Sequence, residues 1–361
     1  MIHVRRVLLG LAVAVLPLFA GCSSSSTSTT PTPPPSVSFI YYSSGDGSTG
    51  LIGSPQLGIT GYPITATSTV LTTLDATAGN GFVYTENLAF QGGNLYVVNE
   101  STPNTVMVFT PPLTATSNPI AILTLPATIT GAFGIAFDSA GNMWISDTSN
   151  DTISKFTCPC ATTATLVAAV TMVSPANPNG IAFDNSGNLW VALAQATNSI
   201  GEYVLPAGGF INSTMVSVYL DGLKDADSVT FDHSGNLYSG GDPPSGIASK
   251  RYLRLHMPLP QAAAIHPNVV EADGIGFWPV ANLVSGGLPT IVNSTGLAAG
   301  FNSYQLGIDP AGNLYDADCG TTAHLYVYPT GTSAWSTTLA PVVYTDASIT
   351  TNDCVSGIAG H

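Results

Sequence analysis

Hydrophobic residues occur in short runs along most of this chain, and turn-forming residues separate the runs. GIAF at 134–137 and NMWI at 142–145 are two such runs, divided by a cluster of Asp, Ser and Gly. The runs are too short for helices, and helical periodicity is almost absent. Short apolar runs bounded by Gly, Asn and Asp are typical of β-strands joined by tight turns. The pattern therefore predicts an all-β protein.

One phrase returns along the chain at a nearly fixed spacing. It reads GIAFDSAGNMWISD at 134–147, GIAFDNSGNLWVAL at 180–193, SVTFDHSGNLYSGG at 228–241 and LGIDPAGNLYDAD at 306–318. Its fourth position falls on Phe90, Phe137, Phe183, Phe231, Phe277 and Ile308, with spacings of 46 to 48 residues and a last one of 31. Each unit contains a strand, a turn, a second strand and one or two further apolar runs. Four short strands per repeat of this length predict the blades of a β-propeller.

The Asp and the Gly of the phrase have a structural explanation. Asp can accept hydrogen bonds from backbone N–H groups two residues on, and Gly can adopt the positive φ that the turn needs. The residues concerned are Asp138, Asp184, Asp232 and Asp309, and Gly141, Gly187, Gly235 and Gly312. We expect them to build hairpin turns rather than to bind a metal.

The two ends of the repeat region predict how the ring closes. CVSGIAGH at 354–361 repeats the first strand of the phrase, and FIYYSS at 39–44 matches the strand that should follow it. A blade made from both segments would remove the open sheet edges, which otherwise invite aggregation. We expect seven blades, or six if the degenerate unit GIGFWPVANLV at 274–284 is an insertion.

The stretch GIAFDSAGNMWISDTSNDTISKF at 134–156 resembles the NHL repeat. This repeat is found in NHL-type propellers and in the streptogramin-lyase-like and gluconolactonase-like propellers. FIYYSSGDGSTGLIG at 39–53 is similar to a related surface-propeller repeat. The resemblance covers most of residues 37–361 and implies a propeller domain there. It implies no single function, because such propellers bind proteins, sugars or RNA, or catalyse several reactions.

The N-terminus has the pattern of an export signal. MIHVRR is basic, VLLGLAVAVLPLFA is apolar, and Leu18-Phe19-Ala20-Gly21-Cys22 follows. Residues 1–21 are thus predicted to be a signal peptide. The last five residues resemble a bacterial lipobox, which implies that Cys22 is lipidated and anchors the chain in the cell envelope. Ser23 after it implies the outer membrane where the cell has one. Residues 22–36, rich in Ser, Thr and Pro, are expected to be an extended tether.

Composition narrows the choice of partners. Charged residues make up 8% of the chain, and 7 Lys and Arg stand against 21 Asp and Glu, which gives a net charge of −14. So acidic a protein is a poor binder of nucleic acid. Its surface must consist largely of Ser, Thr, Asn and Gly, as is common in exported bacterial proteins. We expect a monomer whose partners are the membrane, through Cys22, and an unknown protein or small-molecule ligand.

Acidic residues gather in two sets of loops that a propeller places on one face. These are the loops before each first strand and after each second strand, and we call their side of the ring the mouth face. The candidate ligand-binding residues there are Glu86, Glu100, Asp147, Asp227, Asp273 and Asp318. Their oxygens could hold Ca²⁺ or another divalent cation, or attract a cationic ligand. The alternative is a solvated acidic rim without a ligand.

The cysteines divide between the two faces. Cys319 follows a second strand and Cys354 precedes a first strand, so both are expected on the mouth face of adjoining blades, where they would form a disulfide. Cys158 and Cys160 follow a third strand and are expected on the opposite face, either as a small disulfide ring or as two metal ligands.

No catalytic motif stands out. The chain has neither a G-x-S-x-G elbow nor a phosphate-binding loop. The lyase resemblance implies a His and Glu metal set on the mouth face, but the matching loops carry acids and no His. The gluconolactonase resemblance implies a Glu, Asn and Asp set, for which Glu86, Asn179 and Asp227 are candidates. We therefore expect a non-catalytic binding module that acts through its acidic mouth face, with a metal-dependent lactonase or lyase as the alternative.

Overall fold

The structure is a computed structural model, and it consists of strands with one short 3-10 helix, η2 (Val280–Asn282), among the residues that it describes. These residues are 39–45, 56–65, 67–75, 81–157, 165–171, 177–194, 199–205, 216–220, 223, 226–241, 274–284, 288–292, 303–318, 324–328, 341–345 and 354–360. They all belong to one compact unit, Pro35–His361. Within these ranges, no helix is long and apolar enough to span a membrane.

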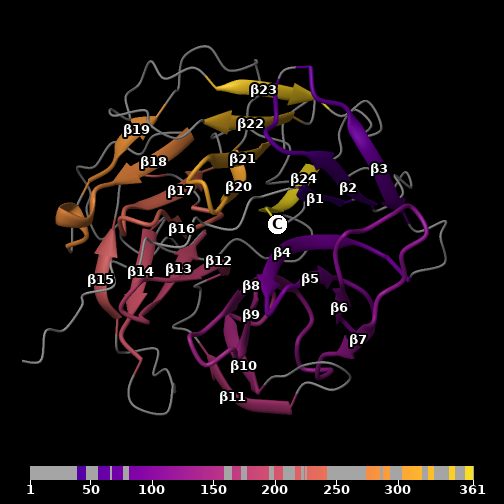
Figure 1. The fold of residues 1–361 in the computed structure, drawn as a ribbon. Helices are drawn as coiled ribbons and strands as arrows, with labels where there is room; N and C mark the ends of the chain where they lie inside the picture. The colour runs from indigo at the N-terminus through magenta and orange to yellow at the C-terminus, as the bar shows by residue number, and fades with distance from the viewer. Residues whose placement is uncertain are drawn as a thin grey trace, which may run out of the picture. The chain divides into compact units, whose positions relative to one another are not determined.

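Six antiparallel sheets of four strands each are arranged around a central axis (Figure 1). Five blades are formed by consecutive strands, here ordered from the axis outward. The first consists of β4 (Thr85–Gln91), β5 (Asn94–Asn99), β6 (Thr105–Phe109) and β7 (Ala121–Thr124), and the second of β8 (Ala132–Phe137), β9 (Met143–Asp147), β10 (Thr152–Thr157) and β11 (Thr165–Thr171). The third consists of β12 (Pro178–Phe183), β13 (Leu189–Leu193), β14 (Ser199–Tyr203) and β15 (Val216–Leu220), and the fourth of β16 (Thr230–Phe231), β17 (Leu237–Gly241), β18 (Gly274–Trp278) and β19 (Thr290–Val292). The fifth consists of β20 (Ser303–Ile308), β21 (Leu314–Asp318), β22 (His324–Tyr328) and β23 (Val342–Thr345). The protein is a β-propeller, as the repeat predicts.

The sixth blade joins the two ends of the propeller. Its strands, from the axis outward, are β24 (Cys354–Gly360), β1 (Phe39–Gly45), β2 (Gln56–Gly61) and β3 (Val70–Asp75). β24 pairs with β1 in antiparallel register, with Tyr42 opposite Ile358. The predicted closure by strands from both ends is therefore confirmed.

The number of blades in the described structure is six, the smaller of the two predicted values. The difference lies in GIGFW at 274–278, which looks like a first strand in the sequence. This segment forms β18, the third strand of its blade, and pairs with β17 on one side and β19 on the other. Residues 242–273 lie between β17 and β18 in the sequence, so the long separation imitates the start of a new repeat.

The hairpin turns have the geometry that the Asp and Gly positions predict. In the turn between β8 and β9, Gly141 has a φ of 79°, a left-handed conformation that favours glycine. Asp138 Oδ1 accepts hydrogen bonds from the backbone N–H groups of Ala140 and Asn142, at 3.1 and 2.9 Å. The other oxygen, Oδ2, accepts a bond of 3.1 Å from Trp144 Nε1. The Asp therefore fixes both the turn and the aromatic side chain of the following strand.

That aromatic side chain packs between blades. Trp144 lies edge-on to Phe183 of the next blade, with ring centroids 5.7 Å apart. The same contact joins Trp190 to Phe231, and Tyr96 to Phe137. Aromatic pairs of this kind contribute beyond the apolar area that they bury. The repeat thus supplies both halves of each such blade contact.

Asp138 makes one further contact that its counterparts lack, and this yields a test. Lys155 Nζ lies 3.1 Å from Asp138 Oδ2 and 5.1 Å from the Trp144 ring centre, whereas Glu202 occupies the matching position opposite Trp190. Burial opposes ionisation of Asp138, but hydrogen bonds from Asn142, Trp144 and Lys155 outweigh it and lower its pKa. A lowered pKa stabilises the fold above the unfolded-state pKa, and this contribution is lost as the pH falls through the folded-state pKa.

Replacing Asp138 by Asn should therefore destabilise the propeller by about 1–2 kcal/mol near neutral pH. The loss should shrink in acid, because the wild-type carboxylate is then protonated too. Thermal unfolding followed by calorimetry at several pH values measures it. Asp184→Asn is the matched control: it changes the same turn position in the neighbouring blade, which has no lysine partner there, and should cost less. Equal losses for both variants at every pH would contradict the role of Lys155.

Candidate functional site

The strands give the channel two different ends. The first strand of each blade runs from the mouth face to the opposite face, which carries the hairpin turns and which we call the hairpin face. The first strands β4, β8, β12, β16, β20 and β24 surround the channel (Figure 1). Residues just before and at the start of these strands therefore lie near the mouth face, and residues near their ends lie near the hairpin face.

Two aromatic side chains close the channel toward the mouth face. Phe133 of β8 and Tyr304 of β20 come from blades on opposite sides of the ring, and both are buried. Their rings meet edge-on at 90°, with centroids 5.7 Å apart. Because they meet across the axis, the channel is not an open pore through the propeller.

A buried polar network lies beside this aromatic pair. Asn87 Nδ2 donates to Gln305 Oε1 over 3.0 Å, and Gln305 Nε2 donates to the backbone oxygen of Asp227 over 3.5 Å. Asn179 Nδ2 donates to Asp227 Oδ1 over 2.6 Å. Four blades are thus linked across the axis. Buried groups hydrogen-bonded in this way hold a fixed arrangement, because each would lose its partner on moving.

The predicted mouth-face acids are mostly buried rather than arranged as an open ring. Glu86, Asp147, Asp227 and Asp318 are at most 4% exposed, and Glu100 is half-buried. The sixth residue, Asp273, lies outside the described residues.

Asp147 illustrates the structural use of these carboxylates. Its two oxygens accept hydrogen bonds from the backbone N–H groups of Thr130, Gly131 and Ser149. A side-chain bond from Asn150 Nδ2 adds to these. The carboxylate thus organises the loop that leads into β8. That these acids bind a ligand stays a prediction.

The structure brings together only part of the metal sets considered above. Asn179 and Asp227, two of the three residues that the gluconolactonase resemblance implies, are hydrogen-bonded to one another. Across the described ranges, no three His, Cys, Asp or Glu side chains lie close enough to hold a metal ion. Cys22, Cys158, Cys160 and Cys319 lie outside the described residues, as does the side chain of Cys354. Lipidation and the disulfide therefore stay predictions.

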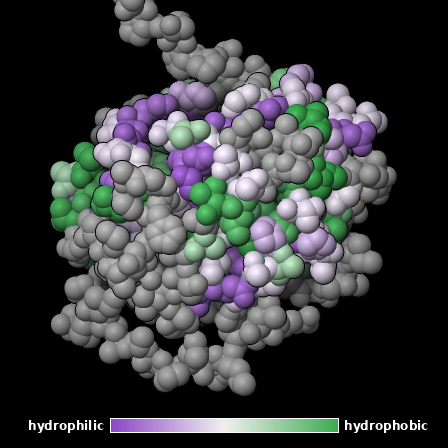
Figure 2. Space-filling model, turned by 90° about the horizontal axis from the view of Figure 1, so that it is seen from below, coloured by the Kyte–Doolittle hydropathy of each residue, from purple (hydrophilic) through white to green (hydrophobic). Residues whose placement is uncertain are grey.

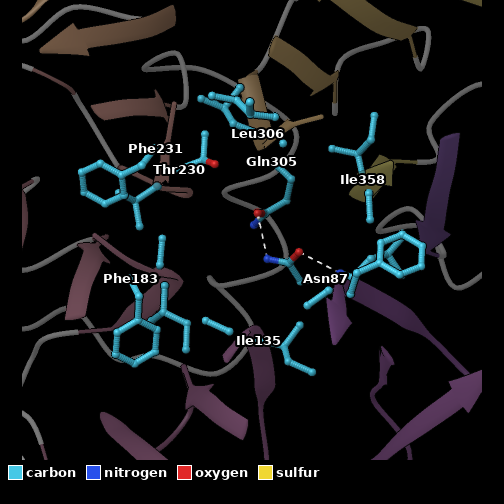
Figure 3. Close-up of a pocket in the computed structure, with 18 of the residues that line it drawn as sticks. Asn87, Ile135, Phe183, Thr230, Phe231, Gln305, Leu306 and Ile358 are labelled. Atoms are coloured by element: carbon cyan, nitrogen blue, oxygen red, sulfur yellow. Dashed lines mark hydrogen bonds between the residues drawn. The ribbon is translucent and has the colours of Figure 1, made fainter. Parts of the chain in front are cut away.

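A pocket of about 500 Å³ occupies the channel between the polar network and the hairpin face (Figure 3). Each blade contributes one aliphatic side chain to its wall, from the same position of the repeat. These are Leu88, Ile135, Ile181, Val229, Leu306 and Ile358. Asn87 and Gln305 lie at the inner end, with their amides pointing toward one another (Figure 3). The pocket is the size of the sites in which proteins bind small organic molecules.

The lining of this pocket is mixed, and more of its exposed surface is polar than apolar. Its six aliphatic side chains are at most 8% exposed, and its inner end carries two amides. The carboxylates at its rim, Asp232 and Asp309, are engaged by N–H and O–H donors of their own hairpins. His233, at the same rim, is exposed, as expected for a turn residue.

Sequence reasoning did not find this pocket. The signal was present, because the third position of the repeated phrase is small in every blade and lines the pocket: Ala89, Ala136, Ala182, Thr230, Gly307 and Ala359. These small residues leave a cavity only if the six first strands lie far enough from the axis. That distance depends on the number of blades, which the degenerate unit at 274–284 obscured.

Asp316 is a second unusual feature, located between two blades. Other blades have Val97, Ile145 or Val191 at this position of the second strand. Asp316 is fully buried, and Ser303 Oγ donates to its Oδ1 over 2.8 Å, whereas Oδ2 has no hydrogen-bond partner within the described part of the chain. Burial raises its pKa well above the usual value, against the Ser303 hydrogen bond, and the nearby Asp318 raises it further. Burial thus favours the neutral form of this carboxyl group.

The comparisons with known proteins bear on the fold. No family model matches the sequence, and no curated protein matches it. Solved structures do match. A protein of unknown function from Bacteroides caccae is 11% identical with a TM-score of 0.55, and the match covers 90% of this chain and 99% of that one. A putative 6-phosphogluconolactonase from Bacteroides uniformis is 15% identical with a TM-score of 0.52, covering 90% and 85%.

A streptogramin B lyase is a further match, 12% identical with a TM-score of 0.48 and covering 87% of this chain and 89% of that one. The match to the putative lactonase, with its higher TM-score, agrees with the propeller fold seen in the strands and expected from the repeat. At these identities the likeness shows the fold alone.

The raised pKa of Asp316 gives a prediction about pH. A raised pKa means that the folded protein keeps a proton that the unfolded chain releases above about pH 4, so this group makes stability fall as the pH rises. Asp316→Asn mimics the neutral acid and should raise the melting temperature by a few degrees near neutral pH, with little change in acid. Calorimetry across this range measures it. The opposite sign is expected for Asp138→Asn; a loss of stability at every pH for Asp316→Asn would contradict the neutral state.

Proposed function

We propose that the chain is a non-catalytic, envelope-anchored β-propeller that binds a small uncharged ligand in the pocket at the hairpin end of its channel. The pocket is the observation that carries this proposal. Its wall combines six aliphatic side chains, one from each blade, with the amides of Asn87 and Gln305 at the inner end. A concave site of this volume that combines apolar and polar groups can hold a small molecule.

This pocket lies toward the hairpin face, whereas the ligand-binding residues predicted from the sequence lie toward the mouth face. At the mouth end, Phe133 and Tyr304 meet across the axis and leave the channel closed. A ligand that uses the channel therefore has its access from the hairpin face. The acidic loops remain a candidate surface for a second, protein or cationic, partner.

A metal-dependent lactonase or lyase is the alternative from another class. It would need three or four oxygens or imidazole nitrogens that converge on one point. Asn179 and Asp227 converge in this structure, but they do so through a hydrogen bond to one another. The fold likeness to a putative lactonase does not favour the alternative, because propellers of this kind differ in function.

Attachment to the cell envelope is part of the proposal and rests on the sequence. The basic residues before the apolar run, and the Leu18 to Cys22 motif after it, support export followed by lipidation at Cys22. The acidic propeller would be repelled by anionic headgroups, so the lipid has to provide the attachment.

Blocking the pocket should abolish binding of an apolar probe. N-phenyl-1-naphthylamine, a neutral fluorophore, should bind the wild-type protein saturably and one to one. Thr230→Phe, which places a ring in the pocket wall, should weaken binding by about tenfold or more, equivalent to ~1.4 kcal/mol. Ala127→Phe, at an exposed site between β7 and β8, is the matched control and should bind as the wild type does. Unchanged binding in Thr230→Phe, or turnover of lactone substrates with added Ca²⁺ or Zn²⁺, would contradict the proposal.

Anchoring is tested at Cys22. Cells that express the wild-type chain and are fed labelled palmitate should incorporate the label into this protein, which should sediment with membranes. Cys22→Ser should carry no label and should appear in the soluble fraction after export, because one hydrophobic anchor has been removed. Wild-type protein that is unlabelled and soluble would refute the anchor without affecting the pocket.

A further inference from the structure

Exposed aliphatic side chains are concentrated on one side of the propeller. Those on the described surface, apart from Val83, lie in connections at the hairpin face or in the first three residues of outermost strands, which begin at that face. Each blade contributes at least one. We call the set Leu71, Ile120, Val167, Val204, Val280 and Val343 the apolar rim.

The side chains of the apolar rim are strongly exposed to solvent. Ile120 is 56% exposed and Val280 is 58% exposed. Single exposed aliphatic residues are normal on any protein, whereas these recur near one face in all six blades. Figure 2 views the ring edge-on, and hydrophobic residues lie there among hydrophilic ones.

The point at which the chain enters the propeller shows which face is tied to the proposed membrane anchor at Cys22. β1 is the second strand of the closing blade, and it starts at the hairpin face: Phe39 lies opposite Gly61, the last residue of β2, and Ile40 lies opposite Gly360, the last residue of β24. The segment between Cys22 and Phe39 therefore joins the propeller at the hairpin face. At about 3 Å per residue in an extended Pro-rich form, it reaches at most roughly 50 Å.

We propose that the hairpin face, through the apolar rim, docks on the lipid bilayer to which the Cys22 lipid anchors the chain. This inference rests on the anchor of the proposed function. The short tether gives the attached face a high effective concentration at the bilayer, so weak apolar contacts are enough to orient the propeller. The pocket then opens toward the bilayer.

The charge of the protein sets a condition on the lipid. With a net charge of −14, the chain is repelled by anionic headgroups, and docking should be favoured on zwitterionic ones.

Val83 provides the internal reference for the opposite face. It is 57% exposed, like Ile120, but it precedes β4 and lies at the mouth face.

Photolabelling by lipid tests the orientation. The full lipidated chain is reconstituted into phosphatidylcholine and phosphatidylethanolamine vesicles that contain a lipid with a diazirine in its acyl chain. After irradiation and proteolysis, peptides that carry Ile120, Val167, Val280 or Val343 should be labelled several-fold more than the peptide with Val83. Adding phosphatidylglycerol should reduce the difference.

Substitutions in the apolar rim test whether its side chains contact the lipid or only lie close to the bilayer. Ile120→Ser together with Val280→Ser should lower labelling of the hairpin face several-fold without affecting flotation of the protein with the vesicles, since both side chains are exposed and the anchor is intact. Val83→Ser is the matched control and should change nothing. Melting temperatures of all variants confirm folding.

The outcomes separate the two proposals. Wild-type protein that fails to float with vesicles would overturn both the anchor and the docking. Protein that floats but is labelled equally on both faces would overturn the docking alone. Hairpin-face peptides that lipid leaves unlabelled, but that native membranes protect from hydrogen exchange, would show that a protein covers this face and would also overturn it.

Discussion

The packing of an aromatic side chain between neighbouring blades is the interaction on which this structure depends. Trp or Tyr on the second strand of one blade meets the Phe that ends the first strand of the next, as in Trp144 with Phe183. The hairpin Asp holds the polar tip of the same aromatic residue, so the turn and the blade contact are fixed together. A charge-poor chain has few ion pairs available for this purpose, and repeated apolar contacts replace them.

The arrangement of the channel follows from this packing. The six first strands are held side by side around the axis, so their equivalent residues form rings. Large residues at one ring position, Phe133 and Tyr304, close the channel, while Ala, Gly and Thr at another leave the pocket open. One repeated sequence position thus determines each level of the channel. The size of the side chains at each level of the channel decides whether the channel is closed or open there.

The sequence predicts the fold well because its signals are local. Turn residues such as Asp184 and Gly187 fix hairpins, and the match between CVSGIAG and FIYYSS fixes the closing blade. The site is harder to predict because it depends on contacts between distant residues. Burial of Asp147 and Asp227, which read as exposed acids in the sequence, depends on loops that fold over them. The role of GIGFW as a third strand depends on its pairing with β17, which no local pattern reveals.

The closing blade also constrains when the protein can fold. β1 belongs to the first part of the propeller to be synthesised, and its partner β24 belongs to the last. Until residues 354–360 have been made and delivered to the same compartment, β1 lacks its inner neighbour and the ring has two open sheet edges. The geometry of one strand pair therefore couples closure of the ring to the synthesis of the last strand of the propeller.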